Sequence, residues 1–136
     1  MNPQLVLSKI DSIGRYLERI KQHYDGELET LTHNFDAQDI IILNLLRACE
    51  QTLDLANHTI KTNNLKTPTS ARDSFAILAS SKIIDHRLAE QLGNMTGFRN
   101  LATHQYHQIN MEILKSILDK QLNDFQEFSK QIAGLL

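Results

Sequence analysis

Apolar residues recur every three or four positions along most of this chain, which is the pattern of amphipathic α-helices. Between residues 4 and 24 these positions are Leu5, Ile10, Ile13, Leu17 and Ile20, with charged side chains between them. Between residues 37 and 63 the apolar surface broadens, and the segment IIILNLLRACE is apolar on more than one side. A helix of this kind either lies at the centre of a bundle or also faces a second copy of the chain.

Turn-forming residues separate the predicted helices. The segment HYDGE ends the first helix, residues 32–35 are a predicted loop, and Asp36 is the expected N-cap of the second helix. Pro68 interrupts the chain again, and Ser70 suits the N-cap of a short helix that follows it directly. We expect a further helix to begin near Asp85.

One apolar stripe runs through the last part of the chain. We predict that it forms the core-facing side of a single helix that begins near Asn110, and its members are Ile113, Leu114, Ile117, Leu118, Leu122, Phe125 and Phe128. No strand-like alternation of useful length occurs. The sequence therefore predicts an all-α fold, an antiparallel bundle of four long helices plus a short one. A chain of 136 residues suits one domain, and we expect that domain to span residues 1–136.

The overall charge argues against a protein that coats nucleic acid. The chain has 14 basic and 16 acidic residues and a net charge of -2, so any contact with nucleic acid has to be local. The single cysteine, Cys49, lies in an apolar run and is expected to be buried. One cysteine forms no intrachain disulfide, and no signal peptide or membrane-length apolar run is evident, so we expect a cytoplasmic protein.

The segment FRNLATHQYHQ gathers an arginine, an asparagine, a threonine, two histidines and a tyrosine within eleven residues. The imidazole of His104 can take up and release a proton near neutral pH. The guanidinium of Arg99 is permanently charged and binds phosphate oxygens through a planar fork. Together they suffice for cleavage of RNA by its own 2′-hydroxyl, with His104 transferring the proton and Arg99 stabilising the charge on phosphorus. This chemistry requires no metal.

Helical spacing does not bring this pair together within one regular helix. Arg99 and His104 are five residues apart, which corresponds to about 500° of rotation and leaves the side chains about 140° apart. They converge if the helix loosens near Ala102, or across the two-fold axis of a symmetric dimer. Asn100 does share a face with His104, since these two are four residues apart. The simplest alternative is that all of them are ordinary surface residues.

A metal site in this segment is not expected. His104 and His107 are three residues apart and could offer two ligands from one helix face. A zinc site needs three or four ligands, and the sequence shows no third one at motif spacing. We therefore predict neither a metal nor another cofactor.

The motif resembles a known family. RNLATH fits the R-polar-x-x-x-H pattern of HEPN-domain ribonucleases, and RNLATHQY fits the longer R-x4-H-x-Y pattern of the HepT toxins within that superfamily. The segments QDIIILNLLRACEQTLDLANHTI, ARDSF and GFRNLATHQY are similar to HepT proteins in order and spacing, so that the resemblance covers roughly residues 5–130.

This resemblance implies a fold, an activity and a partner. HepT proteins are helical homodimers of the HEPN type, metal-independent endoribonucleases and the toxins of type VII toxin–antitoxin modules. Arg99 and His104 match their catalytic pair, which lies at the dimer interface, and Asn100 matches the polar position between them. Tyr106 matches the tyrosine to which a cognate MntA-type nucleotidyltransferase antitoxin transfers AMP from ATP. The added charge and bulk would oppose the binding of RNA phosphates.

Two other functions are compatible with the same residues. In the first, the protein is a non-catalytic binding partner of a small nucleotidyltransferase, and Arg99 and His104 hold nucleotide phosphate without cutting RNA. In the second, it is a purely structural helical dimer. An RNA-binding rim could be supplied by Arg47, Arg72 and Arg87, although we favour a structural pairing of Arg72 with the neighbouring Asp73.

Overall fold

The computed structural model describes all 136 residues and contains helices but no β-strand, which confirms the all-α prediction. The helices are, in chain order, α1 (Pro3–His23), α2 (Leu28–His33), α3 (Phe35–Thr62), α4 (Ala71–Ser80), α5 (His86–His104), the 3-10 turn η1 (Tyr106–Gln108), α6 (Met111–Lys120) and α7 (Leu122–Ala133).

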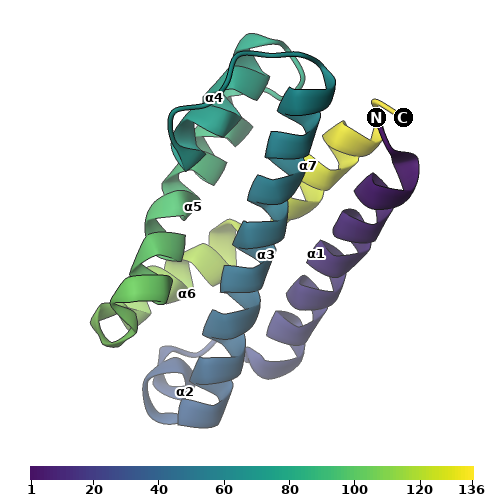
Figure 1. Ribbon diagram of the computed structural model, residues 1–136. Coiled ribbons are helices and arrows are strands. Elements are labelled where there is room, and N and C mark those ends of the chain that lie inside the picture. Colours follow the sequence, from purple (N-terminus) through teal and green to yellow (C-terminus); the bar gives the residue numbers. More distant parts are fainter.

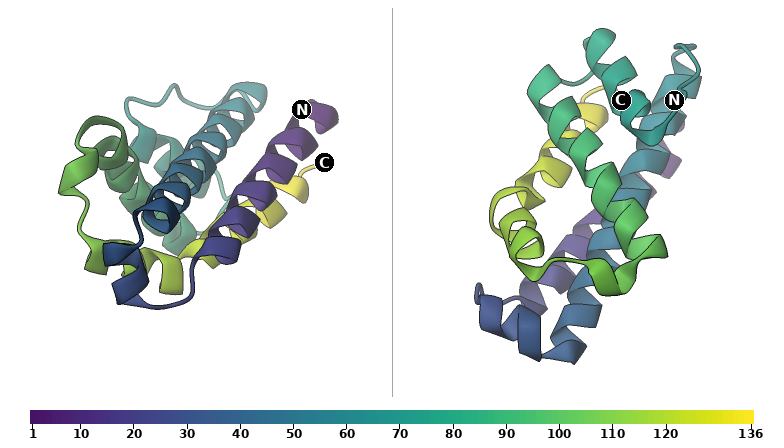
Figure 2. Two further views of the ribbon diagram at one scale, coloured as in Figure 1. Left: turned by 90° about the horizontal axis from the view of Figure 1, so that it is seen from below. Right: turned by 90° about the vertical axis from the view of Figure 1, so that its left-hand side faces the viewer.

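The long helices run antiparallel to one another. In Figure 1 α1 descends, α3 returns upward, α5 descends and α6 and α7 return towards the end at which both termini lie. α3 contacts α1, α2, α4, α5 and α7, which confirms the first of the two alternatives for this helix, a place at the centre of the bundle. α2 packs against α3 and α6 at the end of the bundle opposite the termini, as the views in Figure 2 show. No helix is both long enough and apolar enough to cross a membrane.

One continuous core of 32 buried apolar residues holds the helices together. Phe75 of α4 and Phe128 of α7 meet edge to face, with their ring centroids 5.8 Å apart. Two predicted core positions are wrong, because Leu5 is 37% exposed and Ile113 is 61% exposed. Each lies at the edge of its stripe, where periodicity alone does not tell which side the neighbouring helix covers.

The predicted loop at 32–35 is also wrong. α2 extends into this segment, and α3 begins at Phe35. The N-cap of α3 is Asn34 rather than Asp36, since the Asn34 side chain accepts a hydrogen bond of 3.1 Å from the backbone N–H three residues later. α2 escaped prediction because it has only six residues and buries a single side chain, Leu31.

The last predicted helix is in fact two helices. The chain leaves helical geometry at Gln121, whose φ and ψ are -121° and -3°, and this residue separates α6 from α7. Leu118 and Phe125 lie on either side of the break and are both buried. They are about two helical turns apart, so the apolar stripe continues across the bend and hides it from the sequence pattern.

The helix starts predicted after Ser70 and near Asp85 are confirmed for α4 and α5, and the Asp85 side chain proves to be a cap as well. Ser70 accepts a hydrogen bond of 3.0 Å from the backbone N–H of Asp73. Asp85 accepts one of 2.7 Å from the backbone N–H of Leu88 and a second of 3.1 Å from the amide of Gln131 in α7. The first turn of α5 is therefore anchored, and its packing against α3 and α7 positions the opposite end, which carries the candidate site.

Candidate functional site at the end of helix α5

α5 is a regular helix up to and including His104, its last residue. Gln105 then ends it, with its backbone N–H still bonded to the carbonyl of Leu101 at 2.8 Å. Ala102 is buried within the helix, so the interpretation that the helix loosens there is wrong. Within one chain, Arg99 and His104 therefore project about 140° apart and do not converge.

The guanidinium of Arg99 has no acidic partner. Its Nη1 donates a long hydrogen bond of 3.4 Å to Oδ1 of Asn100, and no carboxylate lies within ion-pairing distance. The Arg99 backbone carbonyl accepts the hydroxyl of Thr103 at 2.8 Å, one turn further on. Asn100 thus contacts Arg99 directly, and the positive charge remains available for an anion.

Arg99 also lines a cavity too small for a nucleotide. This cavity has a volume of about 10 Å³, room for at most one water molecule, and Cys49 and Thr52 also line it. Thr52 Oγ1 is buried without a hydrogen-bond partner. Burial raises the pKa of Cys49 to about 12, so its thiol is not a nucleophile at neutral pH.

His104 is exposed and makes no side-chain hydrogen bond within the protein. Both ring nitrogens are therefore free to form hydrogen bonds with a bound molecule. None of the larger hollows of the surface is lined by His104 or by Tyr106. His107 lies in η1 rather than on α5, so the two histidines do not share a helix face.

Tyr106 lies in η1, directly after α5, with 39% of its surface exposed. Its hydroxyl donates a hydrogen bond to Oδ1 of Asp39 in α3. Burial and the Asp39 carboxylate raise the pKa of Tyr106 above its ordinary value, so the hydroxyl is protonated at neutral pH. Sequence reasoning missed Asp39 because it is 67 residues away, and no local pattern connects the two.

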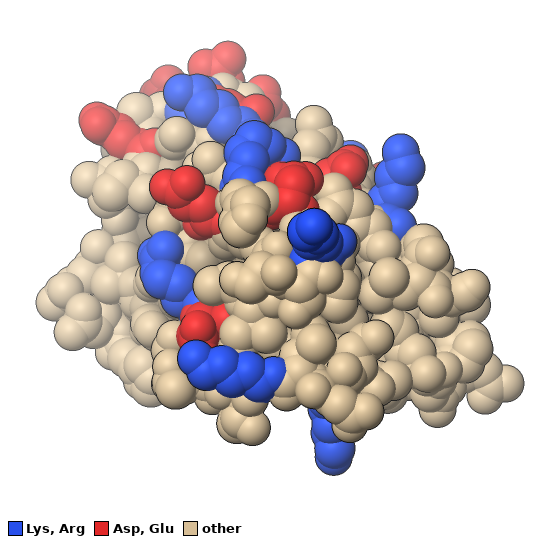
Figure 3. Space-filling view, turned by 90° about the horizontal axis from the view of Figure 1, so that it is seen from above, with Lys and Arg blue, Asp and Glu red and all other residues tan.

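Two of the three arginines predicted to form a basic rim bind other side chains of the protein. Arg87 forms an ion pair of 3.4 Å with Asp124. Arg72 donates a hydrogen bond of 3.1 Å to Asn94, so the favoured pairing with its neighbour Asp73 is wrong. Arg47 is exposed and has no ionic partner. Acidic and basic side chains alternate over the end of the bundle that carries α4, without a patch of one sign (Figure 3).

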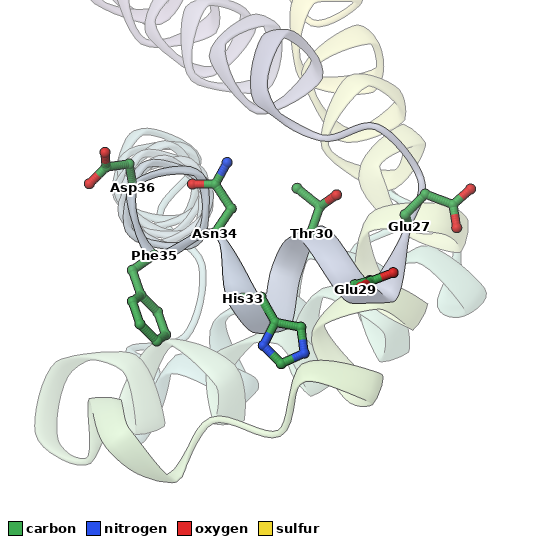
Figure 4. Close-up of a pocket in the computed structure, with 7 residues that line it drawn as sticks. All are labelled: Glu27, Glu29, Thr30, His33, Asn34, Phe35 and Asp36. Carbon is green, nitrogen blue, oxygen red and sulfur yellow. The ribbon is translucent and has the colours of Figure 1, made fainter.

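A broad hollow at α2 is unsuited to RNA phosphates. It is an open depression of about 780 Å³ formed by α2 and the start of α3, and Figure 4 shows the side chains that line it: Glu27, Glu29, Thr30, His33, Asn34, Phe35 and Asp36. Three carboxylates repel a polyanion. No three His, Cys, Asp or Glu side chains in the chain lie together in a way that could hold a metal ion.

Comparison with known proteins gives close relatives. The chain is 39% identical to the mRNA nuclease HepT of Shewanella oneidensis over 124 residues, which cover 91% of this chain and 92% of the relative. It is 25% identical to the tRNA nuclease HepT of Aphanizomenon flos-aquae over an alignment of 138 residues, covering 100% and 92% of the two chains.

The fold is also similar to a solved structure. The tri-AMPylated Shewanella oneidensis HEPN toxin, in complex with MNT antitoxin, superimposes with a TM-score of 0.90 and 38% identity, covering 98% of this chain and 99% of the toxin. A family model described as ribonuclease HepT-like matches residues 13–132. The helical bundle and the R-x4-H-x-Y segment at the end of α5 thus have a common explanation: the chain belongs to the ribonuclease HepT-like family.

Proposed function

We propose that this protein is the toxin of a toxin–antitoxin pair and a metal-independent endoribonuclease, with Arg99 and His104 as its catalytic residues. The observation that carries the proposal is the unpaired guanidinium of Arg99 on the same helix as the unbonded imidazole of His104. Relatives named as mRNA and tRNA nucleases, which match over most of the chain, support it. Each copy of the chain is a single domain over residues 1–136.

The reaction follows from the chemistry of the two groups. His104 removes the proton of a ribose 2′-hydroxyl, and the oxygen attacks the adjacent phosphorus. Arg99 stabilises the extra negative charge that develops on the phosphate oxygens. The bond to the 5′-oxygen breaks, an imidazolium protonates this leaving oxygen, and a 2′,3′-cyclic phosphate remains. DNA is not a substrate because it lacks the attacking hydroxyl.

The site requires two copies of the chain. Arg99 and His104 diverge on a regular helix, and His104 lines none of the larger hollows of the protomer. A two-fold axis near this end of α5 would place the arginine of one copy beside the histidine of the other, which gives two equivalent arginine–histidine clefts related by the axis. Asn100 supports the site by its contact with Arg99.

Tyr106 is the proposed site of control. A nucleotidyltransferase antitoxin transfers AMP to its hydroxyl, as the AMPylated toxin in complex with MNT antitoxin suggests by analogy. Tyr106 follows His104 by two residues and is partly exposed. A phosphodiester at this position adds negative charge and bulk beside the catalytic imidazole, and both oppose RNA binding.

The proposal is tested by incubating the protein with total cellular RNA in EDTA. The parent chain should cleave the RNA, and His104→Ala should be slower by at least about 100-fold. His107→Ala is the matched control, since it removes a second exposed histidine of the same segment, and it should cleave like the parent. Intact mass first establishes that Tyr106 carries no AMP. If the unmodified parent does not cleave RNA, or if His104→Ala cleaves it equally fast, the assignment is wrong and the non-catalytic partner of a nucleotidyltransferase becomes the better description.

A further inference from the structure

The hydroxyl of Tyr106 points at a carboxylate that has no other partner. Its proton lies in the hydrogen bond to Asp39 Oδ1, which joins η1 to the first turns of α3. Asp39 makes no ion pair and accepts no other side-chain or backbone hydrogen bond. Asp39 itself is exposed, and more than a third of Tyr106 is accessible. The pair therefore stands at the surface, within reach of another protein.

The two other tyrosines of the chain lack this arrangement. The hydroxyl of Tyr24 also donates to a carboxylate, Asp119, at 2.6 Å. However, the ammonium of Lys115 binds this carboxylate at 2.7 Å and also reaches the Tyr24 hydroxyl at 3.3 Å. Tyr16 is partly buried and its hydroxyl makes no hydrogen bond. Tyr106 alone combines exposure with an unshared carboxylate.

A phenol needs such a base when it attacks phosphorus. With an ordinary pKa of about 10, a tyrosine hydroxyl is protonated at neutral pH and has to lose its proton as the new bond to phosphorus forms. Phosphoryl-transfer enzymes commonly place an aspartate against the attacking hydroxyl for this purpose. In this protein the aspartate belongs to the modified chain and is already in hydrogen-bond contact with the oxygen that reacts.

We propose that Asp39 is a catalytic residue for the modification of Tyr106, where it holds the hydroxyl in place and accepts its proton during AMP transfer. This inference rests on the proposed function, in which Tyr106 receives AMP from ATP. The Tyr106 oxygen attacks the α-phosphorus, and its O–H bond breaks with transfer of the proton to Asp39 Oδ1. The bond between the α-phosphorus and the bridging oxygen breaks, and pyrophosphate leaves with the bonding electron pair.

The same contact makes the reaction depend on Asp39. Burial and the Asp39 carboxylate hold the pKa of Tyr106 high, so the free phenolate is scarce and does not offer an alternative route. An asparagine at position 39 could still accept the hydrogen bond through its carbonyl oxygen, but it has no capacity to take up the proton. The substitution Asp39→Asn thus separates proton transfer from positioning.

The test measures the first AMP added to the purified chain by its nucleotidyltransferase antitoxin and ATP, followed by intact mass over time. At saturating antitoxin, Asp39→Asn should lower the initial rate by at least about 100-fold. Asp39→Glu keeps a carboxylate near the hydroxyl and should be faster than the asparagine variant. Asp36→Asn is the matched control, because it neutralises an exposed aspartate one turn earlier on α3 that makes no hydrogen bond to Tyr106, and it should react like the parent.

The possible failures are distinguishable. If the parent chain gains no AMP, or if Tyr106→Phe gains it equally well, the proposed function of Tyr106 fails whatever Asp39 does. If the parent is modified on Tyr106 but Asp39→Asn loses less than about tenfold in the saturated rate, the role of Asp39 is overturned. The same holds if only the antitoxin concentration for half-maximal rate changes, since Asp39 would then be a binding contact. A glutamate variant no faster than the asparagine variant also overturns it.

Discussion

Mixing two inactive variants tests whether the ribonuclease site is shared between two copies of the chain. Arg99→Ala and His104→Ala each remove one member of the proposed pair. α5 is regular through His104, so the two side chains of one copy project about 140° apart. If the arginine of one copy works with the histidine of the other, a heterodimer of the two variants contains one cleft with both residues and one with neither.

The expected recovery follows from this geometry. In an equimolar mixture that exchanges freely, about half of the dimers are heterodimers, and each has one intact cleft of two, so the mixture should regain about a quarter of the parent rate. Each variant alone should stay at least about 100-fold below the parent. A site contained within one copy would give no recovery, because neither variant holds both residues.

The assay follows cleavage of a fluorescently labelled RNA in EDTA, and native mass spectrometry of size-tagged chains reports the fraction of heterodimer. Arg99→Ala mixed with the double variant Arg99→Ala/His104→Ala is the control, since none of its dimers has an intact cleft. Heterodimers at about half of the population without regained activity would refute the shared site. The same reasoning fails if the protein is monomeric at concentrations where it cleaves RNA.

Two further predictions concern the scaffold and the buried thiol. Hydrogen bonds from the backbone of Leu88 and the amide of Gln131 lower the pKa of the Asp85 carboxyl in the folded protein. The ionised carboxylate therefore stabilises the fold fully above the unfolded-state pKa of about 4. This stabilisation is lost as the pH falls through the lower folded-state pKa. Asp85→Ala should therefore reduce the free energy of unfolding by about 1 kcal/mol at pH 7 and by less at pH 3, as urea titrations measure; an equal loss at both pH values would contradict this origin. Burial raises the pKa of Cys49 to about 12, so native protein at pH 8 should not react with a disulfide reagent. Protein unfolded in urea should consume one equivalent of the reagent. Rapid reaction of the native protein would contradict this prediction and would show that the core opens at α3.

The placement of charges shows where sequence reasoning reached its limit. A favoured pairing of Arg72 with its neighbour Asp73 proved wrong, because the arginine extends across to Asn94 on α5. Arg87 likewise reaches Asp124 on α7. Long side chains choose partners among all the groups that packing brings near them, and a neighbour in sequence is only one of these. Of the three arginines predicted to form a basic rim, only Arg47 has no side-chain partner within the protein.

The sequence by itself determined the local structure and the chemical candidates. The 3.6-residue period of apolar positions marks the long helices α1, α3 and α5, and the capping side chain of Ser70 marks the start of α4. The R-x4-H-x-Y segment carries Arg99, His104 and Tyr106. These features depend on residues within a few positions of one another. The short α2 and the bend at Gln121 escaped because neither interrupts that local signal strongly.

Only the tertiary structure decided which of these residues meet. It kept α5 regular through His104, which separates Arg99 from His104 around the helix within one copy. It also brought Asp39 of α3 against the hydroxyl of Tyr106 across 67 residues of chain. The rotation of each helix about its axis and the packing of its apolar face set such contacts, and many remote pairings are compatible with the same periodic pattern. Local periodicity determines the helices, whereas their mutual packing determines the neighbours of each reactive group.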